Sequence, residues 1–222
     1  MFDRIAPTYD LLNRLLSAGT DVRWRRRAVD ALDLSGPGRI LDLCTGTADV
    51  LIEWAERGRD RSGFGIDLSM QMLERGARKL RERGLVGRTG LLSGDAERLP
   101  FRSGCFDAAL VAFGIRNVGD IDAALREVAR VVRSGGRFTI LEFSMPSGLF
   151  GALYRLYFGH LLPLAGRLLS GDGAAYSYLP ASVLKFDTPE ALAARMERAG
   201  FAGVSRTRLS LGIAWLHTGT RA

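Results

Sequence analysis

Cysteine and histidine are scarce in this chain of 222 residues, which has two of each. Cys44 and Cys105 form neither a C-x-x-C pair nor a disulfide framework, so we expect the protein to work in a reducing compartment, the cytoplasm. Because histidines are few and no His, Cys or acidic residues cluster at metal-binding spacing, we expect no metal. These shortages exclude a disulfide-rich class of protein and argue against a metal site.

Long hydrophobic runs are also lacking. The richest apolar region, residues 149–169, is interrupted by Arg155, His160 and Arg167, which makes it unsuitable as a membrane-spanning helix. The first residues do not form a basic segment followed by an apolar one, so we expect no secretory leader. Without repeats or low-complexity tracts, the length suits one α/β domain over residues 1–222.

Acidic residues are outnumbered by basic ones, 24 against 31, which gives a formal net charge of +7. This excess permits attraction to nucleic acid or to anionic lipid. Much of it lies in clusters at 23–27 and 75–83, and the second cluster has the spacing of the solvated face of a helix. Since no basic groove is interleaved with aromatic residues, we expect no nucleic acid partner.

One stretch, residues 38–49, organises the rest. An apolar strand containing Asp42 leads through small residues, among them Cys44 and Gly46, into a helical pattern at 50–55. In open α/β sheets ligands bind at this junction, and a glycine lets backbone N–H groups approach them closely. The pattern alone also fits an ordinary strand, turn and helix that binds nothing.

A second strand at 63–66 ends in Asp67, at the distance after Gly46 that a βαβ unit requires. An acid at this position is placed to accept hydrogen bonds from a ribose diol. The turn lacks the G-x-G-x-x-G pattern of a pyrophosphate site, and Asp49 at the start of the helix would repel phosphate. We therefore expect a ligand with an adenosine-like ribose and no phosphate, a description that fits S-adenosylmethionine.

A third strand, at 90–93, runs into a polar turn. There Asp95 is placed to accept a hydrogen bond from the exocyclic amine of adenine, while the N–H of Ala96 donates to a ring nitrogen. An Asx turn that satisfies its own loop is the alternative for Asp95. A fourth strand, at 106–113, brings Arg116 and Asn117 to the same edge. Four strand ends that converge on one edge indicate a site.

Helical periodicity continues outside these strands. Residues 1–34 form a predicted N-terminal cap, in which Asp21 is the expected N-cap of the second helix. Phe2, Tyr9 and Asp10 of this cap either line a substrate pocket or pack. Further helices are expected at 70–84, 121–132 and 189–199, a turn at 134–136, and strands at 137–143, 203–209 and 212–219.

Residues 144–187 are dense in Leu, Phe and Tyr, and a minimal nucleotide-binding sheet does not need them. We interpret this segment as a lid that is inserted before the last strands and lines an apolar pocket. A packing helix or a homodimer interface is the alternative.

With these motifs in place, the chain resembles the S-adenosylmethionine-dependent C-methyltransferases of menaquinone and ubiquinone biosynthesis over nearly its whole length. The most specific matches are FGIRNV at 113–118 and LEFS followed by Pro146. Others are MFD, Ala6, YD and Asn13 near the start, WR at 24–25, DL and GT at 42–47, GDAE and LPF at 94–101, and Tyr176, YL and Ser182.

The resemblance implies a class I methyltransferase fold, with a seven-stranded, mostly parallel sheet and one antiparallel strand. It implies ring methylation of a polyprenyl naphthoquinol or benzoquinol, most simply demethylmenaquinol to menaquinol. The family's cofactor positions fall on Thr47, Asp67, Asp95 and Ala96, and Ala112 stands where serine is usual. The predicted cofactor site comprises Asp42, Gly46, Thr47, Asp67, Leu68, Asp95, Ala96 and Ala112.

A quinol ring becomes nucleophilic when its hydroxyl loses a proton. Arg116 stays protonated, so its predicted role is to stabilise the phenolate or to polarise a water, and Asn117 would orient the ring or the water. Tyr154 and His160 are candidates for handling the proton, although each also fits a packing role.

An apolar lid suits a polyprenyl tail, and the basic surface would hold the protein peripherally at an anionic membrane. A methyltransferase for a small soluble acceptor and a cofactor-binding scaffold without catalysis are the rival interpretations. The acceptor ring, the prenyl length, the general base and the oligomeric state stay open.

Overall fold

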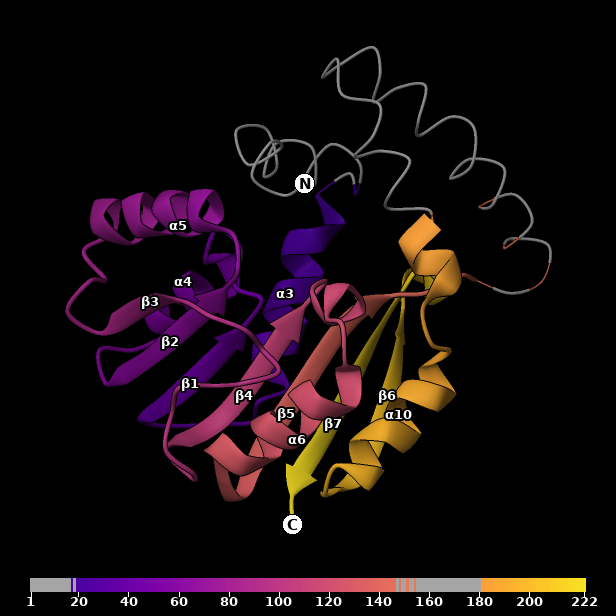
Figure 1. The fold of residues 1–222 in the computed structure, drawn as a ribbon. Coiled ribbons are helices and arrows are strands. Elements are labelled where there is room, and N and C mark those ends of the chain that lie inside the picture. Colours follow the sequence, from indigo (N-terminus) through magenta and orange to yellow (C-terminus); the bar gives the residue numbers. More distant parts are fainter. Residues whose placement is uncertain (1–16, 18, 147, 149–150, 152–153, 155–180) are drawn as a thin grey trace.

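The computed structural model describes residues 17, 19–146, 148, 151, 154 and 181–222 (Figure 1). These residues form an α/β fold around a seven-stranded sheet with strand order β3-β2-β1-β4-β5-β7-β6. The strands are β1 (Gly38–Leu43), β2 (Arg61–Asp67), β3 (Thr89–Ser93), β4 (Phe106–Ala112), β5 (Val132–Phe143), β6 (Phe201–Leu209) and β7 (Ala214–Arg221). Only β7 runs antiparallel to its neighbours, which confirms the predicted sheet.

Helices cover both faces of the sheet (Figure 1). One face carries α3, α4 and α5, and the other carries α6 and α10. Their bounds are α3 (Thr20–Asp30), α4 (Asp49–Glu56), α5 (Met70–Glu82), α6 (Ile121–Val131) and α10 (Pro189–Arg198), with short 3₁₀ turns η1 (Ile115–Asn117) and η3 (Ser210–Gly212). Apart from the N-cap of α3 and the start of β5, the described elements lie within a few residues of their predicted positions.

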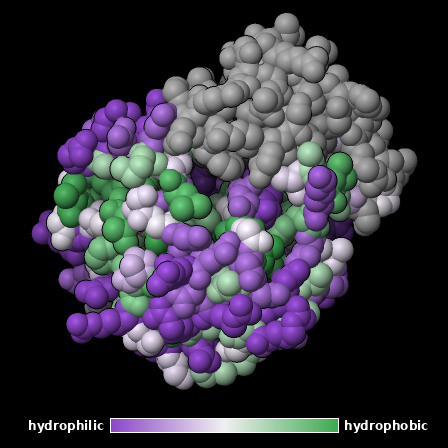
Figure 2. All heavy atoms as spheres, in the orientation of Figure 1, coloured by the Kyte–Doolittle hydropathy of each residue, from purple (hydrophilic) through white to green (hydrophobic). Residues whose placement is uncertain are grey.

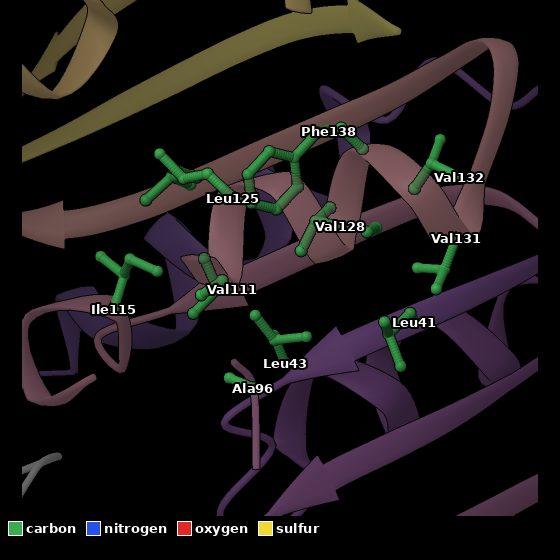
Figure 3. Close-up of a cluster of buried hydrophobic side chains, with 14 of the residues drawn as sticks. Leu41, Leu43, Ala96, Val111, Ile115, Leu125, Val128, Val131, Val132 and Phe138 are labelled. Atoms are coloured by element: carbon green, nitrogen blue, oxygen red, sulfur yellow. The ribbon is translucent and has the colours of Figure 1, made fainter. Parts of the chain in front are cut away.

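In the described part of the chain the sheet separates two large hydrophobic cores, because successive side chains of a strand point to opposite faces. In β1, Ile40 packs toward α3 and α4, whereas Leu41 and Leu43 pack toward α6. Figure 3 shows the second core, where Leu125 and Val128 of α6 lie against the sheet. These side chains are fully buried, so the core holds the strand ends that carry the polar residues in fixed positions.

Side-chain caps explain where several helices begin. Ser69 accepts a hydrogen bond from the N–H of Met72 at the start of α5, and Asp120 and Thr188 cap α6 and α10 in the same way. The prediction for Asp21 is wrong. Gly19, in a left-handed conformation, occupies the N-cap of α3, and Asp21 lies buried in the first turn.

The predicted turn at 134–136 is also wrong, because β5 already begins at Val132. Phe106 pairs with Val132 and Ala108 pairs with Arg137, so the intervening residues bulge within the strand instead of preceding it. A bulge uses the same glycine-rich sequence as a turn, and the sequence alone does not separate the two.

The predicted cap and lid are described in part. Within the predicted N-terminal cap, residues 1–34, helix α3 packs against α4. Within the predicted lid, residues 144–187, residues 181–185 are helical. Phe2, Tyr9, Asp10 and His160 lie outside the described residues.

Figure 2 shows that hydrophilic side chains cover much of the visible face, while hydrophobic ones gather over the side that carries β2 and β3. Phe64 and Leu92, each more than a third exposed, belong to these two strands. Within the described part of the chain, no helix has the length and apolar character needed to span a membrane.

Candidate active site

A cavity of about 220 Å³ opens at the carboxyl ends of β1, β2 and β4, where an open α/β sheet binds its ligand. Four segments that are distant in sequence supply its walls. They are the turn after β1, the end of β2 with the start of α5, the loop after β3, and the turn after β4. The lining residues are Cys44, Gly46, Ile66, Asp67, Leu68, Met72, Gly94, Asp95, Ala96, Glu97, Ala112, Phe113, Gly114, Asn117, Val118 and Gly119.

The turn after β1 is unusually tight. Cys44, Gly46 and Ala48 all have positive φ, at 51°, 53° and 66°. Glycine adopts this conformation without cost, but Cys44 and Ala48 are strained there, and such strain is found at functional sites. Burial raises the pKa of the Cys44 thiol, so it stays protonated and packs as a neutral group.

Asp67 fixes this turn to the end of β2. Its Oδ2 accepts a hydrogen bond from the N–H of Gly46 over 2.8 Å, and its Oδ1 accepts one from the N–H of Ser69 over 2.9 Å. The carboxylate therefore has a defined orientation at the wall of the cavity. Gly46, Asp67 and Leu68 lie together in the site, as their predicted role requires.

Asp42 and Thr47 are not among the residues that line the cavity. Asp42 is 1% exposed, and its Oδ2 accepts a hydrogen bond from the hydroxyl of Thr45 over 2.6 Å. Burial raises the pKa of Asp42 to about 7, against the lowering effect of that hydrogen bond. Thr47 accepts a hydrogen bond from Nζ of Lys79 over 2.9 Å. A direct cofactor contact for either residue stays a prediction.

The loop after β3 contains an Asx turn at Asp95, and the predicted adenine contact of Asp95 stays a prediction. Oδ1 of Asp95 accepts the N–H of Glu97 over 2.9 Å, which is the Asx turn that was the alternative. The same residue lines the cavity beside Ala96, so the turn holds both of them at the site. Ala112 also lines the cavity and contributes no hydroxyl there.

The two polar residues of the turn η1, Arg116 and Asn117, line different cavities. Asn117 lines the cavity, whereas Arg116 lines a neighbouring cavity of about 450 Å³ with Ser182, Lys185 and Phe186 among its walls. The Arg116 side chain is 6% exposed, and its Nη1 lies 2.6 Å from Oε1 of Glu142. The structure thus places Arg116 on the wall of this second cavity and not on the wall of the first.

Sequence reasoning missed the aromatic support behind this turn. Phe113 has a φ of 60°, an outlier for a bulky residue, and it lines the cavity. Its ring stacks on Phe143 with centroids 4.3 Å apart, and Trp24 of α3 lies 6.1 Å from both rings. Gly114 was also missed. The motif FGIRNV was the available signal for both.

Of the two lid candidates, only Tyr154 is described. It packs against the buried Val183 together with Phe143 and Met145. This contact places Tyr154 next to the aromatic support of the site. Its role in proton handling stays a prediction, as does that of His160.

The lining residues determine which ligand chemistry fits. Asp67, Asp95 and Glu97 contribute carboxylates, and none of the described residues on the wall is a lysine or an arginine. Such a wall disfavours phosphate and favours a cation. Among the described residues no group of His, Cys and acids is arranged to hold a metal ion.

Comparison with known proteins agrees with this chemistry. A model of the ubiE/COQ5 methyltransferase family matches residues 1–221. The chain is 50% identical over 222 residues to a demethylmenaquinone methyltransferase from Thermus thermophilus, with 100% of both chains covered. It is 48% identical over 223 residues to the ubiquinone/menaquinone biosynthesis C-methyltransferase UbiE from Syntrophotalea carbinolica, covering 100% of this chain and 93% of that protein.

Solved structures share the fold. An S-adenosylmethionine-dependent methyltransferase from Thermotoga maritima has a TM-score of 0.67 at 21% identity, covering 100% of this chain and 98% of that one. One from Aquifex aeolicus has a TM-score of 0.63 at 15% identity, covering 89% of each chain. The fold is therefore that of class I methyltransferases.

Proposed function

This chain belongs to the ubiE/COQ5 methyltransferase family, and from that premise we propose that it methylates a ring carbon of a polyprenyl quinol with S-adenosylmethionine. The favoured acceptor is a demethylated naphthoquinol, so the reaction would convert demethylmenaquinol to menaquinol. The name of the relative from Thermus thermophilus supports this choice. A benzoquinol is the alternative acceptor, because the name of another relative includes both quinones.

The acidic wall of the cavity is the observation that carries the proposal. S-adenosylmethionine has a ribose diol, a cationic sulfonium and no phosphate, and the carboxylates of Asp67, Asp95 and Glu97 suit all three properties. We propose that the Asp67 carboxylate accepts hydrogen bonds from the ribose hydroxyls. Asp95 would accept a hydrogen bond from the exocyclic amine of adenine, and the N–H of Ala96 would donate one to a ring nitrogen. Gly46, Leu68 and Ala112, which also line the cavity, would be in van der Waals contact with the cofactor.

When bound, S-adenosylmethionine supplies an electrophilic methyl group. The chain's own task is to align the acceptor carbon with that group, to exclude water, and to make the ring electron-rich. The guanidinium of Arg116 remains protonated, so it would stabilise the negative charge that develops on the quinol oxygen. Asn117, on the cofactor side of the same turn, would orient the ring.

Loss of the quinol proton requires a base, either directly or through a water. Tyr154 and His160 are the candidates that the chain offers for this step. We propose one domain over residues 1–222, in which 144–187 cover the polyprenyl tail of the substrate. Peripheral binding to an anionic membrane, through the net positive charge, would bring the enzyme to that substrate.

An assay with three acceptors tests the function. Purified protein is incubated with methyl-labelled S-adenosylmethionine and, separately, a reduced demethylmenaquinone, a reduced demethylated ubiquinone precursor and a small soluble naphthol. We expect label in the first product, identified by mass spectrometry. Label only in the second or third product would select one of the alternative acceptors. Cofactor binding without transfer to any acceptor would support a non-catalytic scaffold instead.

A further inference from the structure

The guanidinium of Arg116 is held from several sides. Its Nη1 donates to Oε1 of Glu142 and to the carbonyl oxygen of Phe113, each over 2.6 Å, and its Nε donates to Oγ of Ser182 over 3.4 Å. The carbon of the guanidinium also lies 5.5 Å from the ring centroid of Phe143. Strand β5, the turn after β4 and the predicted lid therefore meet at this one side chain.

Besides its ion pair with the Arg116 side chain, Glu142 accepts hydrogen bonds from two backbone N–H groups. It is 1% exposed near the end of β5, and its Oε1 also accepts the N–H of Phe143 over 2.8 Å. Its Oε2 accepts the backbone N–H of Arg116 over 3.4 Å. One carboxylate thus binds both the backbone and the side chain of Arg116, which leaves the guanidinium little rotational freedom.

Stability alone does not explain a pair of this kind. A buried ion pair loses the hydration of two charges, and well-packed hydrophobic residues in its place are often as stable or more so. The pair also lies at the carboxyl edge of the sheet, where Arg116 lines one cavity and the next residue, Asn117, lines the other. Its location indicates a role in the site.

We infer that Glu142 is a positioning residue for Arg116: it fixes the direction of the guanidinium and balances its charge. The inference rests on the proposed function, since the direction of Arg116 matters only if a quinol oxygen binds beside it. Glu142 itself is buried behind Arg116, so it acts through that residue and touches no substrate.

Two substitutions separate position from charge. Glu142→Asp keeps the charge but withdraws the carboxylate by one methylene, so kcat should fall about 10- to 100-fold, as expected when a reacting group is misplaced. Glu142→Gln keeps an acceptor at the place of Oε1 and removes the charge, so kcat should fall less. With its charge no longer balanced, Arg116 would favour the phenolate, and the acid limb of the pH profile of kcat should move to lower pH.

The affinity for S-adenosylhomocysteine, measured by calorimetry, should stay within about twofold of wild type in both variants, because Glu142 does not line the cofactor cavity. Asp107→Asn is the matched control. Asp107 pairs with Arg133 over 2.9 Å at the start of β4, the opposite end of the strand from the site. This variant should keep the kcat and the pH profile of wild type.

A double-mutant cycle completes the test. In an Arg116→Ala background, Glu142→Asp should cause no further loss of kcat, because there is no guanidinium left to position. An equal loss with and without Arg116 would overturn the inference, as would a wild-type pH profile for Glu142→Gln. If Glu142→Asp does not fold, the pH profile of kcat for Glu142→Gln still tests the inference. Wild-type protein that methylates no quinol would overturn the proposed function and this inference together, whereas active wild type with unaffected Glu142 variants overturns the inference alone.

Discussion

The N–H of Gly46 donates a hydrogen bond to Oδ2 of Asp67 over 2.8 Å, which joins the turn after β1 to the end of β2. Asp67 has a second donor in the N–H of Ser69, the residue that caps α5. One carboxylate thus sets the geometry of the turn, the start of a helix and part of the cavity wall. We propose that the same carboxylate also accepts hydrogen bonds from a ligand with hydroxyl groups.

Asp67→Asn should weaken cofactor binding. The amide would present an N–H group to the backbone N–H of either Gly46 or Ser69, so one of these bonds is lost together with the charge. Hydrogen bonds to charged groups contribute about 1.5–3 kcal/mol, so the Kd for S-adenosylhomocysteine should rise about tenfold or more. Calorimetric titration measures this, with the exposed Asp60→Asn at the other end of β2 as control. An unchanged Kd would remove Asp67 from the binding site.

Arg116→Lys should reduce turnover far more than cofactor binding. An ammonium group does not reproduce the planar fork that reaches Glu142, Phe113 and Ser182 at once. We expect kcat to fall at least about tenfold while the Kd for S-adenosylhomocysteine stays within about twofold. Arg126→Lys, on the exposed surface of α6, is the control. Full activity of Arg116→Lys would mean that Arg116 has no part in the reaction.

Much of the fold and of the cofactor site could be predicted from the sequence. Apolar runs and caps locate the strands and helices, and parallel strands bring their carboxyl ends to one edge, so Gly46, Asp67 and Asp95 had to lie close together. The same alternation that buries Leu41 and Leu43 toward α6 turns Asp42 to the opposite face. The alternation of side chains along the strand therefore already predicts that Asp42 faces away from α6, although the sequence prediction included Asp42 in the cofactor site.

The pairing of Arg116 with Glu142 was not predictable in this way. The two residues are 26 positions apart, and their contact depends on the register that sets Ala112 against Leu141. Spacing also does not reveal that η1 directs Arg116 and Asn117 to different cavities. Both features depend on tertiary packing, which local sequence patterns do not reveal.

Binding to anionic vesicles should depend on salt. The net charge of +7 attracts an anionic surface, and ions screen that attraction over about 10 Å at 0.1 M salt. We expect the protein to pellet with vesicles that contain phosphatidylglycerol at low salt and to be released as salt rises, with neutral phosphatidylcholine vesicles as control. Equal pelleting at all salt concentrations would exclude an electrostatic basis for the association.

Stability should fall as the pH rises from about 4 to about 7, because of Asp42. Its pKa is about 7 in the folded protein and 3.8 ordinarily, so between these values the folded state holds a proton that the unfolded state has lost. Ionisation of the buried carboxyl then costs on the order of 4 kcal/mol by pH 8. Urea unfolding of wild type and Asp42→Asn across this range measures the effect. The pH dependence should be smaller in the variant, and identical curves would show that Asp42 does not carry this titration.

The effects on stability of substitutions at Gly114 and at Cys44 should depend on each other. A Cβ at Gly114 would overlap with the Cβ of Cys44, so Gly114→Ala should cost about 1–3 kcal/mol of stability and weaken cofactor binding at the adjoining wall. Cys44→Gly removes the obstructing side chain and suits the φ of 51° at that position. The double variant should therefore regain most of the stability that Gly114→Ala loses.

Chemical unfolding of the two single variants and the double variant measures this coupling. Gly36→Ala is the control, because a Cβ there meets no atom within 4 Å. If the losses of Gly114→Ala and Cys44→Gly simply add, then the two residues do not compete for the same space.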